Sequence, residues 1–415
     1  MKPNVVILAA GKGTRMKSSL PKVMHNICGK PLLWYSICIA RAVSKSEPIV
    51  VIGHKAELVQ KELEGEKIRW VKQKGQLGTG HAVLACENIL KSSKESVVVL
   101  NADLPLLQPE ALVEMIKKQR KKHAACVVMT TNIKNPFGYG RILRSQDGSV
   151  SKIVEERDST GLEKTIMEVN SGAYVFDCVE RFKALKKVKT DNAQKEYYLP
   201  DALAVFVKSG KKVLAHKVED EKTVYSVTTR WDLPNISSII MLYKMKRLAE
   251  SGVTIVSPQN TIIDVDVEIG AETIIYPFTV IESGVKIGQF CKVGPFSHLR
   301  KGSILEDYAE IGNFVECKKT TLGAYSKAKH LSYLGDAIIG KKVNIGAGTI
   351  CANYDGKNKH VTKIDDGAHV GSGTVFVAPV KMGKNAVTGA GAIVTRNKDI
   401  PDGETHIGVP AKQRK

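Results

Sequence analysis

Two different spacings of apolar residues divide the chain. From residue 4 to about residue 226, apolar runs alternate with helical stretches, and four runs are predicted strands: VVILAAG, PIVVIGH, SVVVLNADLPLL and AACVVMTT. Strands separated by helices in this way are typical of an α/β domain with a parallel sheet. Because ligands of such sheets bind outside the carboxyl ends of strands, we expect a site at the end of the first run and around Asp103.

A helix is predicted after this domain. The segment 231–251 places apolar side chains at Ile236, Ile239, Ile240 and Tyr243, which is the spacing of one helix face. We interpret it as a helical linker between a domain at 1–230 and a second domain at 252–415.

After Gly252 the apolar spacing changes to six residues. Aliphatic residues recur at Ile263, Ile269, Ile275, Ile281, Ile287, Val293, Leu299, Leu305 and Ile311, and the step returns at Ile364, Val370, Phe376, Met382 and Val394. A hexapeptide repeat has this period, because each six residues form one side of a triangular β-coil with an aliphatic side chain pointing inward. The segment therefore predicts a parallel β-helix. The polar stretch NYDGKNKHVTK, between Cys351 and Ile364, predicts a loop extruded from the coils.

Composition narrows the class of protein. No run of 18 apolar residues occurs, and no apolar segment follows a charged N-terminus, so we expect a cytoplasmic protein without an integral membrane segment. Eight cysteines, Cys178 among them, contain no C-x-x-C pair, which argues against a zinc site and a disulfide framework.

The net charge of +20 is compatible with a nucleic-acid binder or with an enzyme for anionic small molecules. The lysines are dispersed, and the densest run, KKQRKKH at 117–123, closes a predicted helix, where basic residues complement the helix dipole. We therefore expect small anionic substrates and no nucleic acid.

The stretch LAAGKGTRMKSSLPK, residues 8–22, follows the first predicted strand. It lacks the Gly-Lys-Ser/Thr step of a P-loop. Gly11 and Gly13 would let backbone N–H groups approach a phosphate chain, and Arg15 and Lys22 would supply the positive charge. The alternative is a tight turn between a strand and a helix, and the two cations favour anion binding over it.

These residues carry a family resemblance. LAAGKGTRM…LPK, QLGTGHA at 76–82, GYGRI at 138–142, IVEERD at 153–158 and NSG at 170–172 resemble the successive motifs of the sugar-1-phosphate nucleotidylyltransferases. With the hexapeptide repeats, the chain resembles the bacterial bifunctional N-acetylglucosamine-1-phosphate uridyltransferase and glucosamine-1-phosphate acetyltransferase family. The resemblance implies a Rossmann-like nucleotidyltransferase domain, a connecting helix and a left-handed β-helix. It also implies UTP and acetyl-CoA as co-substrates.

In the first domain the resemblance implies that a sugar phosphate attacks the α-phosphorus of UTP and releases pyrophosphate. Asp103 is the expected Mg²⁺ ligand, as a hard carboxylate oxygen at a strand end, although an Asp there also commonly caps a turn. Lys22 is the expected catalytic cation. Nucleotide contacts are expected at Leu8, Ala9, Ala10, Gly11, Gly13, Arg15, Lys22, Asn101 and Ala102, uracil contacts at Gln73, Gly78 and Thr79, and sugar contacts at Gly140, Glu155 and Asn170.

Two positions depart from this family pattern. Ala102 stands where the family usually has Gly. Thr228, in SVTTRWDL, stands where the second Mg²⁺ ligand is an Asn. Because a threonine hydroxyl is one bond closer to the backbone than an Asn carbonyl, we expect a bridging water or a shifted metal, with weaker affinity.

The second site is expected around AKHLSYLGD at 328–336, where His330 breaks the hexapeptide rhythm. Acetyl transfer to an amine needs a base, and a neutral histidine suits it, although a single His on a coil is more often structural. By resemblance, the sugar phosphate contacts are Arg300, Lys318, Tyr333, Asn344 and Lys359, and the acetyl-CoA contacts are Ala347, Asn353, Tyr354, Ser372 and Ala390.

The resemblance has two further consequences for the second domain. Gly408 stands where the family has an arginine near the C-terminus, and Lys412, Arg414 or Lys415 could supply that positive charge instead. The β-helix is also about one coil shorter than in the family between residues 252 and 294. The family also implies a homotrimer with acetyl sites at the subunit seams.

Two alternative functions are weighed against this one. A sugar nucleotidylyltransferase of broader specificity with an altered acyl site is disfavoured by HLSYLGD and NYDGKNK, which keep the base, the cations and the coenzyme positions together. A non-catalytic subunit is disfavoured by Lys22, Asp103 and His330, and only Thr228 supports it.

Overall fold

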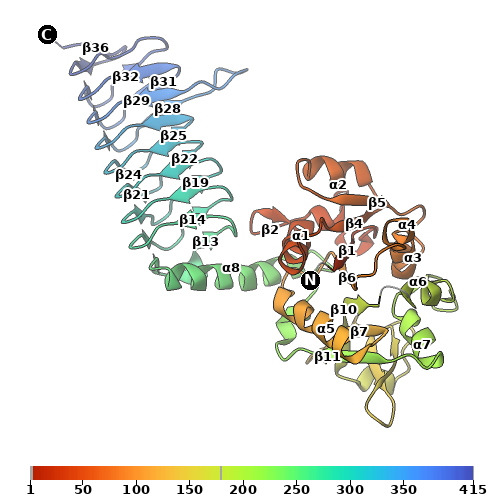
Figure 1. The fold of residues 1–415 in the computed structure, drawn as a ribbon. Coiled ribbons are helices and arrows are strands. Elements are labelled where there is room, and N and C mark those ends of the chain that lie inside the picture. Colours follow the sequence, from red (N-terminus) through yellow and green to blue (C-terminus); the bar gives the residue numbers. More distant parts are fainter. Residues whose placement is uncertain (1–2, 178–179, 415) are drawn as a thin grey trace. The chain divides into compact units, whose positions relative to one another are not determined.

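The computed structural model describes residues 3–177 and 180–414, which leaves Cys178 outside the described residues. The chain forms two compact units, residues 1–236 and 237–415, and the boundary between them falls within helix α8 (Asp232–Glu250). Figure 1 shows an α/β unit and a stack of triangular coils. Among the described residues, no helix is both long and apolar enough to cross a bilayer, and no disulfide joins two cysteines.

The four predicted strands lie in one sheet of the first unit: β1 (Asn4–Leu8), β4 (Ile49–Ile52), β6 (Val97–Asn101) and β7 (Cys126–Asn132). The strand order is β11-β7-β10-β6-β1-β4-β5, with β5 (Arg69–Lys72), β10 (Glu168–Phe176) and β11 (Val213–Lys217), and the hairpin β8 (Arg141–Arg144) and β9 (Val150–Val154) attached to β10.

The expectation of a parallel sheet was wrong for β10 and for the hairpin β8–β9 attached to it, which pair antiparallel. β1 pairs in parallel with β4 and β6, but β10 is antiparallel to both β6 and β7. The reason lies in the connection: a parallel neighbour needs a long crossover, usually a helix, and only the hairpin β8–β9 and a 3₁₀ turn (Glu163–Thr165) separate β7 from β10.

Helices cover both faces of this sheet (Figure 1). Alternate residues of the strands point to opposite faces, so that Val5 and Ile7 of β1 pack in one cluster with α1 (Leu32–Val43) and α5 (Pro109–Lys122), and Val6 packs in another. The remaining helices are α2 (Ala56–Glu62), α3 (Thr79–Leu84), α4 (Glu87–Leu90), α6 (Glu180–Leu185) and α7 (Asp201–Lys208). The basic run at 117–123 ends α5, as predicted.

Helix α8 confirms the predicted linker helix but buries a partly different face. Ile236 and Ile240 are buried, whereas Tyr243 is 37% exposed. Met245 and Leu248 are also buried and pack in the core of the second unit. At about 100° per residue they lie on another face of the helix than Ile236 and Ile240, so the expectation of one buried face that includes Tyr243 was wrong.

The second unit is a parallel β-helix with three sheets (Figure 1). Sheet C contains β12 (Thr254–Ile255), β15 (Ile274–Ile275), β18 (Lys292–Val293), β21 (Glu310–Asn313), β24 (Lys327–His330), β27 (Asn344–Ile345), β30 (His369–Val370), β33 (Val387–Thr388), β35 (Thr405–Ile407) and β36 (Lys412–Gln413). Sheet D contains β13 (Ile262–Ile263), β16 (Val280–Ile281), β19 (His298–Arg300), β22 (Glu316–Lys318), β25 (Tyr333–Gly335), β28 (Ile350–Ala352), β31 (Val375–Val377) and β34 (Ile393–Val394). Sheet E contains β14 (Glu268–Ile269), β17 (Lys286–Ile287), β20 (Ile304–Leu305), β23 (Thr321–Leu322), β26 (Ala337–Ile339), β29 (Thr362–Ile364) and β32 (Val380–Met382).

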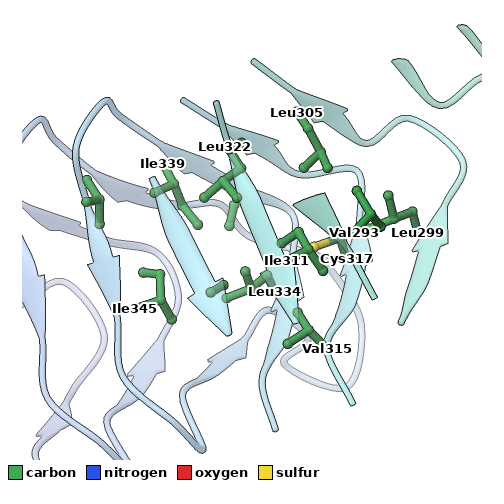
Figure 2. Close-up of a cluster of buried hydrophobic side chains, with 14 of the residues drawn as sticks. Val293, Leu299, Leu305, Ile311, Val315, Cys317, Leu322, Leu334, Ile339 and Ile345 are labelled. Carbon is green, nitrogen blue, oxygen red and sulfur yellow. The ribbon is translucent and has the colours of Figure 1, made fainter. Parts of the chain in front are cut away.

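The predicted six-residue positions form the core of this unit. They are buried from Ile263 to Val394, except that Ile269 in the first coil is half-buried. The coils continue between Ile311 and Ile364, where no six-residue positions were predicted, and Figure 2 shows Cys317, Leu322, Leu334 and Ile339 pointing into the same interior.

This gap in the prediction has a simple cause. The steps from Cys317 to Leu322 and from Leu334 to Ile339 contain five residues, which shifts the phase of the pattern without interrupting the coil. The expectation that His330 breaks the hexapeptide rhythm was therefore wrong. His330 is the last residue of a regular strand, β24. The loop expected after Cys351 is a hairpin with an antiparallel bridge between Tyr354 and Lys359, and it projects from the stack (Figure 1).

Candidate functional site

A cleft of about 460 Å³ opens at the carboxyl ends of β1 and β6. Most of the residues expected to contact the nucleotide line it: Leu8, Ala9, Ala10, Gly11, Gly13, Lys22, Gln73, Gly78, Thr79, Asn101, Ala102 and Asp103. Six further residues line the same cleft but were not predicted from the sequence: Lys12, Thr14, Val23, Gln76, Ala82 and Glu196. Arg15, Gly140, Glu155, Asn170 and Thr228 are not among its lining residues.

Gly11 and Gly13, in the loop after β1, are glycines for different structural reasons. Gly13 has a φ of 60°, and a Cβ there would lie 2.6 Å from Cβ of Lys22, so the close crossing of these two backbone segments requires glycine. A Cβ on Gly11 would meet nothing within 4 Å, so this glycine borders open space in the cleft. The exposed Arg15 lies in the following 3₁₀ turn (Thr14–Met16).

Lys22 and Asp103 meet across the cleft. Lys22 Nζ lies 2.5 Å from Oδ2 of Asp103, and both side chains are 19% exposed. The other oxygen, Oδ1 of Asp103, is buried and has no hydrogen-bond partner. An unsatisfied buried carboxylate oxygen at this position fits a hard divalent cation.

Such a coordination shell would draw on few protein groups. Among the described residues, no group of three or more His, Cys, Asp or Glu side chains could hold a metal. Mg²⁺ commonly binds through one or two carboxylates together with waters and phosphate oxygens, so the single free oxygen of Asp103 is compatible with it.

Thr228 is held next to Asp103, although it does not line the cleft. The backbone N–H of Val227 donates to the carbonyl of Asp103 at 3.0 Å, and the N–H of Thr228 donates to Oδ2 of Asp232 at 2.8 Å. Arg230 Nε donates to the carbonyl of Met16 at 3.0 Å, which ties the same segment to the opening loop.

The expected uracil residues pack against a segment that the sequence reading did not identify. A Cβ on Gly78 would lie 2.6 Å from the carbonyl oxygen of Tyr197, so only glycine permits this approach. The N–H of Leu199 donates to Thr79 Oγ1 at 3.0 Å. The segment KEYYLP at 195–200 thus forms one wall of the cleft through Glu196, and no recognised motif marked it.

The three expected sugar residues form a separate group. The N–H of Asn170 donates to the carbonyl of Gly140 at 2.8 Å, and a Cβ on Gly140 would lie 3.3 Å from Oε1 of Glu155. A Cβ on Gly172 would lie 2.4 Å from Nδ2 of Asn101. The strand that carries Asn170 therefore touches the cleft through Asn101, and Gly172 is a site-forming residue that was missed.

Burial raises the pKa of Glu155 to about 7, and the carboxylates of Asp201 and Asp158 add to the effect. The pKa of Asp201 is raised to about 6, by burial first and by Asp158 second. Near neutral pH the Glu155 carboxyl is therefore partly protonated, so it can both donate hydrogen bonds to the hydroxyl groups of a ligand and accept hydrogen bonds from them.

A stability prediction follows from Glu155. Because its folded pKa lies above the ordinary value of 4.5, the folded state binds the proton more tightly than the unfolded state, and stability is lost as pH rises from about 4.5 through about 7. We expect Glu155→Gln to stabilise the protein by on the order of 2 kcal/mol at pH 8 and by almost nothing at pH 4.5. Denaturant unfolding at the two pH values measures this, and an equal effect at both would contradict the assigned cause.

In the second unit, the candidate base and three candidate coenzyme contacts share one position in successive coils. Asn313 pairs with His330. In the following coils the residues two positions earlier are in register, namely Ala328 with Ile345, Ile345 with Val370 and Val370 with Thr388, so the residues two positions after them also align. The shared position is occupied in turn by His330, Ala347, Ser372 and Ala390. We call these four residues the corner column.

The residue that follows the corner position in each coil explains why the corner column is accessible. In earlier coils this place holds Phe278, Phe296 and Phe314, whose rings stack with centroids 4.9 and 5.3 Å apart. Beside Ala347, Ser372 and Ala390 it holds Gly348, Gly373 and Gly391, all with positive φ. Loss of the large side chains leaves the corner column uncovered along these coils.

The expected phosphate contacts gather on sheet D. Arg300 and Lys318 end adjacent strands in register, and the nearby ammonium of Lys359, from the hairpin, lowers the pKa of Lys318. The ring of Tyr333 lies over Gly335, the next residue in register with Lys318. Arg300 pairs with Glu316 at 2.9 Å and with Glu282 at 3.9 Å, and the three cations together form a site for an anion.

The remaining predicted residues are more widely placed. Asn344 lies on sheet C, three residues before Ala347, and Asn353 and Tyr354 lie at the base of the hairpin, beyond sheet D. Gly408, which has a φ of 86°, lies in the turn between the final two strands, β35 and β36, where Lys412 lies opposite Ile407. Arg414 follows in the same segment, and Lys415 lies outside the described residues.

Known proteins resemble this chain over both units. The family model of the MobA-like NTP transferase domain matches residues 5–166, and that of the bacterial transferase hexapeptide, with six repeats, matches residues 266–301. A bifunctional protein GlmU of Syntrophomonas wolfei is 41% identical over 434 residues, with 97% of this chain and 96% of the relative covered. Proteins of the same name from Bacillus subtilis and Streptococcus agalactiae are 40% identical, with 95% of this chain and 93% of each relative covered.

Proposed function

Because the chain belongs to the family of bifunctional GlmU proteins, we propose how its two units divide the synthesis of UDP-N-acetylglucosamine. The protein is an acetyltransferase for glucosamine-1-phosphate and a uridyltransferase for N-acetylglucosamine-1-phosphate. The observation that supports two separate reactions is that one unit contains a cleft with Lys22 and Asp103, whereas the other unit contains the corner column with His330.

In the first unit, an oxygen of the sugar phosphate attacks the α-phosphorus of UTP, and the bond to the β-phosphate breaks to release pyrophosphate. Lys22 neutralises charge on the phosphates, and the backbone around Gly11 and Gly13 admits the triphosphate. Gln73, Gly78 and Thr79 bind the uracil, while Gly140, Glu155 and Asn170 bind the sugar. A divalent metal, which we assign as Mg²⁺ on Oδ1 of Asp103, supplies charge stabilisation at the phosphates when bound.

Thr228 gives a specific test of the metal site. We expect Thr228→Asn to lower the Mg²⁺ concentration that gives half-maximal pyrophosphate release by about three- to tenfold, since an amide carbonyl reaches further from the backbone than the threonine hydroxyl. A Mg²⁺ titration of uridyl transfer measures the change, with Thr229→Asn as the matched control. An unchanged Mg²⁺ dependence would remove Thr228 from the coordination shell.

In the second unit, the amine of glucosamine-1-phosphate attacks the thioester carbonyl of acetyl-CoA. His330 accepts the amine proton, and coenzyme A leaves as the thiol. Arg300, Lys318, Lys359, Tyr333 and Asn344 bind the sugar phosphate. Ala347, Ser372 and Ala390 border the coenzyme together with Asn353 and Tyr354.

We further assign a homotrimer. The coenzyme residues lie at two corners of the same coils, and a neighbouring subunit against the corner column would enclose the groove between them. Light scattering is expected to give three times the monomer mass of 45.3 kDa.

The function is tested by following each half reaction alone. Acetyl-CoA with glucosamine-1-phosphate is expected to release thiol in the presence of EDTA, whereas UTP with N-acetylglucosamine-1-phosphate is expected to release pyrophosphate only when metal is present. Absence of either product from the metal-loaded protein would overturn the corresponding half of the proposal.

A further inference from the structure

The side-chain amide of Gln73 is fixed in one orientation. Gln73 is 6% exposed and lines the cleft. Its Nε2 donates to the carbonyl oxygen of Gly78 at 3.2 Å and lies 2.9 Å from Nδ1 of His81. Because a carbonyl can only accept, the nitrogen end of the amide must face Gly78, which determines which end is left for a ligand.

This orientation determines the protonation of His81. Both hydrogens of the Gln73 amide are committed, one to Gly78 and one to His81, so Nδ1 of His81 must accept. The imidazole is therefore neutral, with its proton on Nε2. His81 lies in α3 and is half-buried, with its ring centroid 6.4 Å from that of Tyr197.

We infer that His81 is a positioning residue that sets base specificity by holding the carbonyl oxygen of Gln73, rather than its amide nitrogen, toward the base. Among the described residues, no group donates to Oε1 of Gln73. This inference rests on the proposed function, in which Gln73 binds uracil. At N3, uracil carries a hydrogen and cytosine carries a lone pair, so a fixed carbonyl oxygen accepts from the first and repels the second.

The same chemistry limits what the contact can select. Thymine carries the same N3–H, so the carbonyl of Gln73 excludes cytosine but does not separate UTP from dTTP. Without the His81 acceptor, one amide hydrogen would lose its partner in a buried place, and rotation of the amide would become less costly.

Competition between UTP and CTP in pyrophosphate release tests the inference. His81→Leu is expected to lower kcat/KM for UTP by about three- to tenfold, mainly through KM, and to lower the preference for UTP over CTP by a similar factor. His81→Asn, whose carbonyl oxygen can take the place of Nδ1, is expected to restore the preference. Leu84→Ala, at a half-buried position of the same helix, serves as the control and should leave the preference unchanged.

The outcomes separate this inference from the proposed function. If Gln73→Leu abolishes the preference while His81→Leu leaves it intact, or if His81→Asn is no better than His81→Leu, the role of His81 is wrong and the role of Gln73 stands. If Gln73→Leu keeps the preference, the proposed uracil contact itself fails. Nitrogen-15 NMR of the unmodified protein gives a readout without substitution: an Nδ1 of His81 that carries the proton would overturn the inference.

Discussion

Replacement of His330 by alanine is expected to lower thiol release from acetyl-CoA and glucosamine-1-phosphate by about 10²- to 10⁴-fold, the usual contribution of a positioned general base. The exposed His330 lies in register with Ala347, Ser372 and Ala390, so that its imidazole is next to the proposed coenzyme groove. Pyrophosphate release from UTP is expected to stay within about twofold of the unmodified protein, because it takes place in the other unit.

His369→Ala is the matched control for this substitution. His369 is an exposed histidine on the same sheet, in register with Asn344 and away from the corner column. Both variants are expected to unfold at the temperature of the unmodified protein. Retention of more than about a tenth of the thiol release by His330→Ala would remove His330 from the role of base.

Asp103→Asn is expected to lower pyrophosphate release by on the order of 10³-fold and to leave thiol release unchanged. The substitution keeps the size of the side chain but removes its charge and replaces one of its two oxygens with an amide nitrogen. The side chain can then no longer both accept from Lys22, which lies 2.5 Å from Oδ2, and present a free oxygen at the position of Oδ1. Both changes act on the phosphates of the same substrate.

Asp147→Asn, in an exposed turn of the same unit, is the control for the loss of one negative charge. The activity of Asp103→Asn is measured over a range of Mg²⁺ concentrations. Full recovery at high Mg²⁺ would show that Asp103 contributes only to metal affinity, whereas activity equal to that of Asp147→Asn would contradict any role of Asp103 in the transfer.

The sequence predicted the parts of the fold that repeat or that follow a simple period. Six-residue spacing predicted the β-helix, because each inward position is occupied by an aliphatic side chain that no other architecture places so regularly. The same spacing failed after Ile311, where two five-residue steps shift the phase. The antiparallel strand β10 was missed because it depends on which strands pair, and single-strand patterns do not contain pairing information.

Some residues of the candidate sites could likewise be predicted from the sequence, and others could not. Lys22 and Asp103 could be expected together because both follow predicted strands of one sheet. Gly13 was predicted as a glycine that lets the backbone approach a phosphate, whereas its close crossing with Lys22 is seen only in the structure. Glu196 could not be expected, since no recognised motif marks it. Gly172 lies in the NSG motif at 170–172, but its contact with Asn101 joins segments far apart in the chain and could not be predicted. The orientation of the Gln73 amide depends on a carbonyl and a ring nitrogen, which only the structure brings together.

The most direct test of the two-site account is a coupled reaction of the unmodified protein with glucosamine-1-phosphate, UTP and Mg²⁺, with and without acetyl-CoA, in which thiol and pyrophosphate are followed separately. With acetyl-CoA present, thiol is expected at once, and pyrophosphate only afterwards, in amounts that do not exceed the thiol. Release of pyrophosphate at the same rate without acetyl-CoA would contradict it, because the uridyl site would then accept the sugar phosphate before acetylation.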